Sequence, residues 1–119
     1  MRPFLLALCT ILLAGQAQAH AQLQRAEPRV GSTTATAPKA LRLWFSEGVE
    51  PAFSRVVLIR ADGRAVPVGR LSIDPGDRAL VIVPVLAPLA AGSYRVRWRV
   101  ISVDSHTTQG EFVFTVRPR

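Results

Sequence analysis

The clearest pattern in the chain is the run Tyr94-Arg95-Val96-Arg97-Trp98-Arg99-Val100, in which apolar and cationic residues alternate strictly. Successive side chains of a β-strand point to opposite faces of its sheet. This run therefore predicts a strand with one apolar wall and one wall of arginine. We expect the apolar wall to cover a core and the arginine wall to meet solvent.

Shorter stretches with strand character lie on both sides of this run. We expect further strands over residues 40–46, 54–60, 65–68, 78–84 and 110–117, separated by turns rich in proline and glycine. The pair Asp62-Gly63 predicts a hairpin turn. We expect residues 28–39 to form a loop that lets the N-terminal segment reach away from the first long strand. The pattern predicts an all-β fold, an immunoglobulin-like two-sheet sandwich with Greek-key connections.

The first 19 residues have the three parts of a secretory signal peptide. A short positive start containing Arg2 precedes an apolar run over residues 4–15, and Ala17-Gln18-Ala19 is a small-residue cleavage site. The apolar run is shorter than the about 20 residues that a membrane span needs. We expect cleavage after Ala19 and a periplasmic protein of one domain, residues 20–119. The alternative is an uncleaved anchor or a buried N-terminal helix.

Composition limits the chemistry that the mature domain can perform. Cleavage removes Cys9, so disulfides and thiolate metal sites are excluded, and loss of Arg2 lowers the formal charge from +7 to +6. Fourteen of the fifteen basic residues are arginine, and they are spread over the expected strands. An exported protein meets little nucleic acid, so we interpret the charge as a solvated basic face and expect no nucleic-acid partner.

Cleavage would make His20 the first residue of the mature protein. Its α-amine and its imidazole ring could then close a six-membered chelate around one metal ion. Both groups have ordinary pKa values near neutral pH, at about 7.7–8.0 and about 6.5. Square-planar nitrogen and oxygen ligation favours Cu(II) before Ni(II). The alternative is that His20 marks only where cleavage falls, at a frayed terminus.

Asp104-Ser105-His106 holds the only other histidine of the chain. On an extended backbone, residues two apart point to the same side, so the carboxylate and the imidazole could converge on one ion. The segment follows the strongest expected strand, and binding sites favour such strand-end loops. The alternative is a turn in which Asp104 accepts backbone hydrogen bonds and His106 is merely exposed.

Glu47 follows Phe45-Ser46 at the end of the first long strand. Its carboxylate could bind a metal directly, or accept a hydrogen bond from an imidazole that does. Glu50 is a nearby competitor for either role. Taken alone, each glutamate is more simply explained as a surface acid.

Several stretches together resemble the CopC family of periplasmic copper-resistance proteins. They are FSEGVE at residues 45–50, PLAAGSY at 88–94, WRVISVDSH at 98–106 and GEFVFTV at 110–116, with His20 and Glu27-Pro28 near the start. The resemblance covers essentially the whole mature chain and keeps the order of the motifs. It implies a β-sandwich that binds one Cu(II) ion, acts as a copper carrier or buffer, and works with a membrane copper transporter, CopD.

The resemblance also implies a ligand set. The family's N-terminal amine and histidine fall on His20, its Asp-x-His stretch falls on Asp104 and His106, and its glutamate falls on Glu47. One feature departs from some members, which carry a methionine-rich loop for Cu(I). Met1 is the only methionine here, and cleavage would remove it. Without sulfur ligands, we expect no Cu(I) site.

Two other classes of function stay open at this point. A histidine chelate with open positions also serves copper oxidoreductases that act on polysaccharides, although 100 residues leave little room for a substrate surface. A periplasmic interaction domain that binds no metal would use the sandwich only as a scaffold. Fold alone does not decide among these classes.

Overall fold

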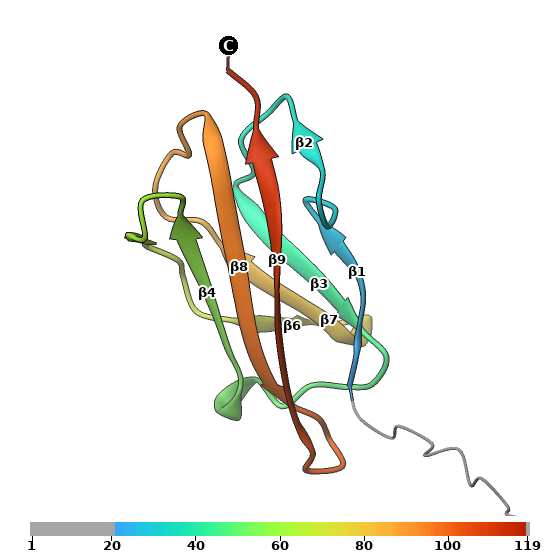
Figure 1. Cartoon of the computed structure of the whole chain (residues 1–119). Helices are drawn as coiled ribbons and strands as arrows, with labels where there is room; N and C mark the ends of the chain where they lie inside the picture. The colour runs from blue at the N-terminus through green and yellow to red at the C-terminus, as the bar shows by residue number, and fades with distance from the viewer. Residues whose placement is uncertain (1–20, 119) are drawn as a thin grey trace, which may run out of the picture.

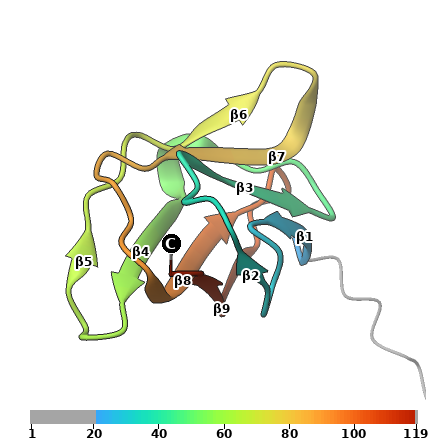
Figure 2. The ribbon, with the colours of Figure 1, turned by 90° about the horizontal axis from the view of Figure 1, so that it is seen from above.

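The computed structural model describes residues 21–118, so the expected signal peptide and His20 lie outside the described residues. The described chain is a sandwich of two β-sheets (Figures 1 and 2). In chain order the strands are β1 (Leu23–Glu27), β2 (Thr33–Thr34), β3 (Ala40–Phe45), β4 (Arg55–Arg60), β5 (Ala65–Val66), β6 (Ser72–Asp74), β7 (Asp77–Pro84), β8 (Gly92–Ile101) and β9 (Thr107–Val116). The 3₁₀ turn η1 (Pro51–Phe53) lies between β3 and β4.

One sheet has four strands in the order β1-β3-β7-β6, and the other has five in the order β2-β9-β8-β4-β5. All neighbours pair antiparallel except β2 and β9, which run parallel. This arrangement confirms the expected all-β, immunoglobulin-like sandwich. Within residues 21–118, no helix has the length and apolar character needed to cross a membrane.

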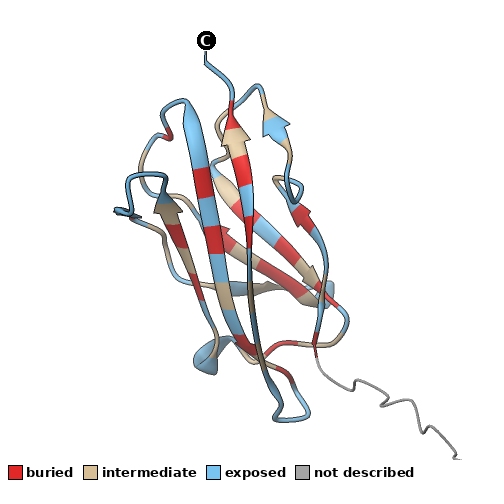
Figure 3. Cartoon of the chain, viewed as in Figure 1, coloured by how far each residue is buried: buried red, intermediate tan, exposed pale blue. Residues whose placement is uncertain are grey.

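Strand β8 shows the alternation that its sequence predicts. Val96 and Val100 are fully buried, whereas Arg95, Arg97 and Arg99 are exposed, and the burial colours alternate along the strand (Figure 3). Its ten residues pair one-to-one with β9, whose Phe112 and Phe114 face the same core. Apolar burial of this stripe stabilises the sandwich.

Tyr94 fixes the start of β8 to the preceding loop. Its ring stacks on Phe114 with centroids 5.6 Å apart, and its hydroxyl donates to the carbonyl of Ala90 at 2.6 Å. A buried tyrosine that bonds back to backbone a few residues upstream is a feature of immunoglobulin-like sandwiches. The aromatic ring thus adds apolar burial while its hydroxyl stays hydrogen-bonded.

The expectation for the N-terminal segment was wrong. Strand β1 pairs antiparallel with β3, with Leu23 opposite Phe45, so the segment runs back along the first long strand instead of away from it. The expected loop over residues 28–39 also contains the two-residue strand β2. Only Ala26 of β1 is buried, so its sequence carries no alternating apolar signal. Backbone pairing to β3, which a pattern of side chains does not show, defines this strand.

Trp98 occupies the inward side of β8 near the end that leads to the Asp-x-His stretch. Its ring meets Phe45 edge to face, with centroids 5.1 Å apart and an interplanar angle of 76°. The ring also packs over Gly110, which is paired with Trp98 on β9. A Cβ atom at residue 110 would lie 2.5 Å from Cζ2 of Trp98. Glycine is therefore required at this position by the close approach of the indole.

We predict that Gly110→Ala lowers the free energy of unfolding by about 1–3 kcal/mol, the usual cost of overpacking a core. Urea denaturation followed by circular dichroism measures this loss. In a Trp98→Leu background the same glycine substitution should cost much less, because the clashing ring is gone. An equal cost in both backgrounds would show that the contact with Trp98 is not the cause.

Candidate metal centre

Three segments that are far apart in sequence meet at one end of the sandwich. They are the turn between β8 and β9, the segment that follows β3, and the start of β1, all at the lower end of the view in Figure 1. Val103 donates its N–H to the carbonyl of Gly48 at 3.0 Å, and Glu50 donates to Ile101 at 2.8 Å. Backbone hydrogen bonds thus fix the segment after β3 against the β8–β9 turn.

The β8–β9 turn brings Asp104 and His106 together. Nδ1 of His106 lies 3.0 Å from Oδ2 of Asp104, and the two side chains are 50% and 37% exposed. The turn is closed by the N–H of Ser102, which donates to the carbonyl of His106 at 2.9 Å, and Ser105 has a φ of 69°. The two side chains therefore lie next to each other, but a tight turn brings them together and not the extended backbone that the sequence suggested. The turn and the exposed His106 also match the alternative interpretation, so binding of one ion by this pair stays a prediction.

Ser102 connects this turn to the core. It is fully buried, and its hydroxyl donates to Oδ1 of Asp104. This hydrogen bond is the main reason why the pKa of Asp104 lies below its ordinary value; burial raises that pKa, and the nearby His106 lowers it further. The carboxylate therefore stays ionised at pH values below the usual range for aspartate, and it is anionic at neutral pH.

The sequence interpretation gave Ser102 no role, although a signal for it was present. Residues 94, 96, 98 and 100 form the inward side of β8, and position 102 continues this alternation. A hydroxyl residue at an inward position needs a hydrogen-bond partner, because burying it alone is costly. The nearest carboxylate along the chain is that of Asp104. The pattern thus contained a reason to expect a Ser102–Asp104 contact.

Glu47 lies on the segment that is bonded to this turn, and it is half-buried. Within residues 21–118, however, no three histidine, cysteine, aspartate or glutamate side chains are close enough together to hold one metal ion. Glu47 is therefore at the same end as Asp104 and His106 but does not complete a site with them. The competing Glu50 uses its backbone here, since its carbonyl accepts a hydrogen bond from Ser54 Oγ at 2.7 Å.

The first described residues are firmly attached at this end. Ala21 is fully buried, and its carbonyl accepts a hydrogen bond from Thr108 Oγ1 at 2.7 Å. Gln22 and Ser46 are joined by two hydrogen bonds of 2.8 Å, one from the N–H of Gln22 to Ser46 Oγ and one from the N–H of Ser46 to the Gln22 carbonyl. The chain therefore enters the sandwich between Thr108 of β9 and Ser46, which are close in sequence to His106 and Glu47.

The chain is similar to known proteins over nearly its whole described length. The family model for the CopC domain matches residues 23–117, which include every described strand. The protein YobA of Escherichia coli strain K12 is 34% identical over 117 residues, covering 98% of this chain and 94% of its own length.

Two solved structures share the fold. The crystal structure of CopC from Methylosinus trichosporium OB3b matches with a TM-score of 0.78 and 33% identity, covering 84% of this chain and 96% of that one. PcoC, a methionine-rich copper resistance protein from Escherichia coli, matches with a TM-score of 0.74 and 31% identity over 83% of this chain and 100% of that one. The fold, the order of the strands and these similarities agree with the sequence motifs, and the chain belongs to the CopC family.

Proposed function

We propose that this protein is a periplasmic Cu(II)-binding protein that carries or buffers copper in copper resistance or homeostasis, and that it is not an enzyme. The observation that carries the proposal is the position of the Asp104–His106 pair beside the attached start of the chain. Membership of the CopC family and the similarity to a copper resistance protein support copper as the cargo.

His20 would supply two of the ligands. It is bonded covalently to Ala21, and consecutive Cα atoms lie about 3.8 Å apart, so the hydrogen bond from Thr108 to Ala21 limits how far His20 can be from the turn. Processing after Ala19 would free its α-amine. The amine and the imidazole of one residue, together with the imidazole of His106, form a nitrogen-rich set that suits Cu(II).

Asp104 and Glu47 would supply oxygen at this site. The lowered pKa keeps Asp104 anionic, as a ligand for a divalent cation must be, and its Oδ2 already lies beside the His106 ring. Because Nδ1 of His106 faces that carboxylate, we propose that copper takes the place of this contact and binds between Nδ1 and the Asp104 carboxylate. Glu47 would act either as a further ligand or as an acceptor for a ligating imidazole.

The exposure of this pair favours a carrier over an enzyme. A copper oxidoreductase needs a surface that holds its substrate beside the metal, whereas a carrier needs a site from which the ion can leave. Half of the His106 side chain is open to solvent at the tip of a hairpin. We therefore propose that copper is handed to a protein partner, for which a CopD-like transporter of the inner membrane is our candidate.

A free N-terminus should be essential to tight binding. One glycine added before His20 should weaken Cu(II) binding by more than about 100-fold, because changes that affect only partners of the ligands cost about 10–100-fold. The added residue turns the amine into a peptide nitrogen, which binds poorly unless it is deprotonated. Competition titrations with the correctly processed protein measure the difference. The matched control carries its extra glycine after Arg119, and equal affinities of all three proteins would rule out the amine ligand.

His106 should contribute more to Cu(II) affinity than Glu47 does. His106→Ala should remove one nitrogen from the Cu(II) shell and should weaken binding more than Glu47→Ala does, because imidazole binds Cu(II) more strongly than a carboxylate in an outer position. Electron paramagnetic resonance counts the nitrogens directly. Glu50→Ala is the control and should leave the spectrum unchanged. A spectrum that also stays unchanged in His106→Ala would exclude this histidine from the site.

The oxidation state should control retention of the metal. PcoC is methionine-rich, but this chain has only Met1, which processing would remove, so soft ligands for Cu(I) are missing. We predict one-to-one binding of Cu(II) and release of copper to a Cu(I) chelator when ascorbate is added without oxygen. The same chelator without ascorbate is the control. Tight retention of Cu(I) would contradict the assigned ligand set.

A further inference from the structure

The outer face of the five-stranded sheet carries a dense group of arginines. We call Arg55 of β4 together with Arg95, Arg97 and Arg99 of β8 the arginine face. All four side chains are exposed and point away from the core, because they alternate with buried residues on their strands. Glu111 of β9 is the one acidic residue among them in the pairing register.

The charges of this face are not balanced within the described protein. Glu111 pairs with Arg97 at 3.0 Å and with Arg95 at 3.3 Å. Arg55 and Arg99 stand directly opposite each other on neighbouring strands, and neither makes an ion pair or side-chain hydrogen bond within residues 21–118. Like charges in this position destabilise a sheet. The stability of the fold therefore does not explain the presence of Arg55 and Arg99.

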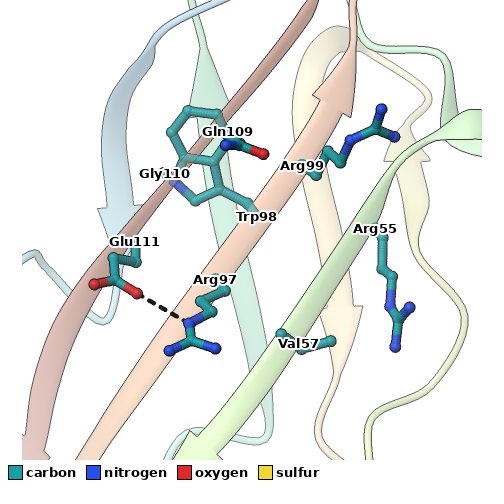
Figure 4. A pocket seen from close by; sticks show the side chains of 8 residues that line it. All are labelled: Arg55, Val57, Arg97, Trp98, Arg99, Gln109, Gly110 and Glu111. Atoms are coloured by element: carbon teal, nitrogen blue, oxygen red, sulfur yellow. Dashed lines mark hydrogen bonds and ion pairs between the residues drawn. The ribbon is translucent and has the colours of Figure 1, made fainter.

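A shallow hollow lies among these side chains. Arg55, Val57, Arg97, Arg99 and Gln109 contribute to its lining, and Figure 4 shows Arg97 turned toward Glu111 while Arg55 and Arg99 extend from adjacent strands. Trp98, Gly110 and Glu111 complete its lining. Guanidinium groups around a small apolar patch are typical of protein interfaces, which are enriched in arginine.

We propose that the arginine face docks an acidic surface of a partner protein, with Arg55 and Arg99 each binding a carboxylate. Guanidinium groups bind carboxylates in a planar, two-pronged geometry. The sheet fixes their spacing, at about 5 Å across the strands and about 7 Å between alternate residues of one strand. A folded protein can match such spacing. It can also pack an apolar side chain against Val57 and place a basic side chain beside Glu111. Four arginines against one glutamate would also attract an anionic membrane, but a membrane surface has no fixed pattern of charges that matches the spacing of Arg55 and Arg99.

The arginine face lies next to the candidate metal centre. The N–H of Ile101 donates to Ser54 Oγ at 3.0 Å, directly before the Ser102–His106 turn. The neighbouring residue pair of the sheet is Arg55 and Arg99. A partner bound here would be held beside that turn. Its role in receiving copper rests on the proposed function, whereas the docking itself does not.

The test uses the full mature protein and a short peptide in which glutamate alternates with threonine as the probe. Binding is followed by NMR, through the amide signals of β4, β8 and β9 and the side-chain N–H signals of arginine. We expect the signals of Arg55 and Arg99 to shift most. The double variant Arg55→Gln, Arg99→Gln should bind the peptide at least about tenfold more weakly, as expected for residues central to an interface. It should stay folded, because the substitutions relieve a repulsion.

The matched control is Arg42→Gln, Arg70→Gln, which removes the same charge from two exposed arginines outside this face. It should weaken binding less than about twofold; an equal loss in both double variants would show attraction by net charge only and overturn the proposal. Binding to phosphatidylglycerol vesicles but not to the peptide would also overturn it, in favour of a membrane. The peptide is titrated into the protein with and without added copper. If the protein fails to bind copper, the proposed function is contradicted but the peptide result still tests the docking proposal.

Discussion

The antiparallel pairing of β8 with β9 is the interaction on which the rest of the structure depends. Its ten residue pairs place one wall of each strand in the core and the other wall in solvent. The inward wall contributes Val96, Val100 and Phe114, which are fully buried. The outward wall carries arginine, and the turn that joins the strands holds Asp104 and His106. A shift of one residue in this pairing would exchange the two walls and lose all three features.

Ser102 shows how closely the core and the candidate site are coupled. It occupies the last inward position of the β8 alternation, where its hydroxyl is shielded from water and donates to Asp104. The same hydrogen bond satisfies a buried polar group and lowers the pKa of the carboxylate. A residue of the core thus helps to fix the geometry of the turn, and its hydrogen bond stabilises the ionised form of a candidate ligand at the surface.

The start of the described chain is held in place mainly by hydrogen bonds and not by apolar burial. Leu23 to Glu27 pair with β3 through backbone hydrogen bonds, with little apolar burial to support them. The attachment of Ala21 to Thr108 adds a side-chain contact with a strand of the other sheet. These bonds hold the entry point of the chain between the two sheets, beside the Asp104–His106 turn. Residues that lie more than eighty positions apart in the sequence, Ala21 and the Asp104–His106 turn, are thus held at the same end of the sandwich.

The sequence by itself determined the all-β class, six of the strands, the two walls of β8 and the candidate residues, because alternation and motif order are local properties. The weak strands β1, β2 and β6 escaped prediction, since backbone pairing with distant partners defines them. Only the tertiary structure decided that Ala21, Glu47 and the Asp104–His106 pair share one end, and that Arg55 stands opposite Arg99. Such proximities depend on sheet order and register, which long-range packing sets and no single segment of sequence contains.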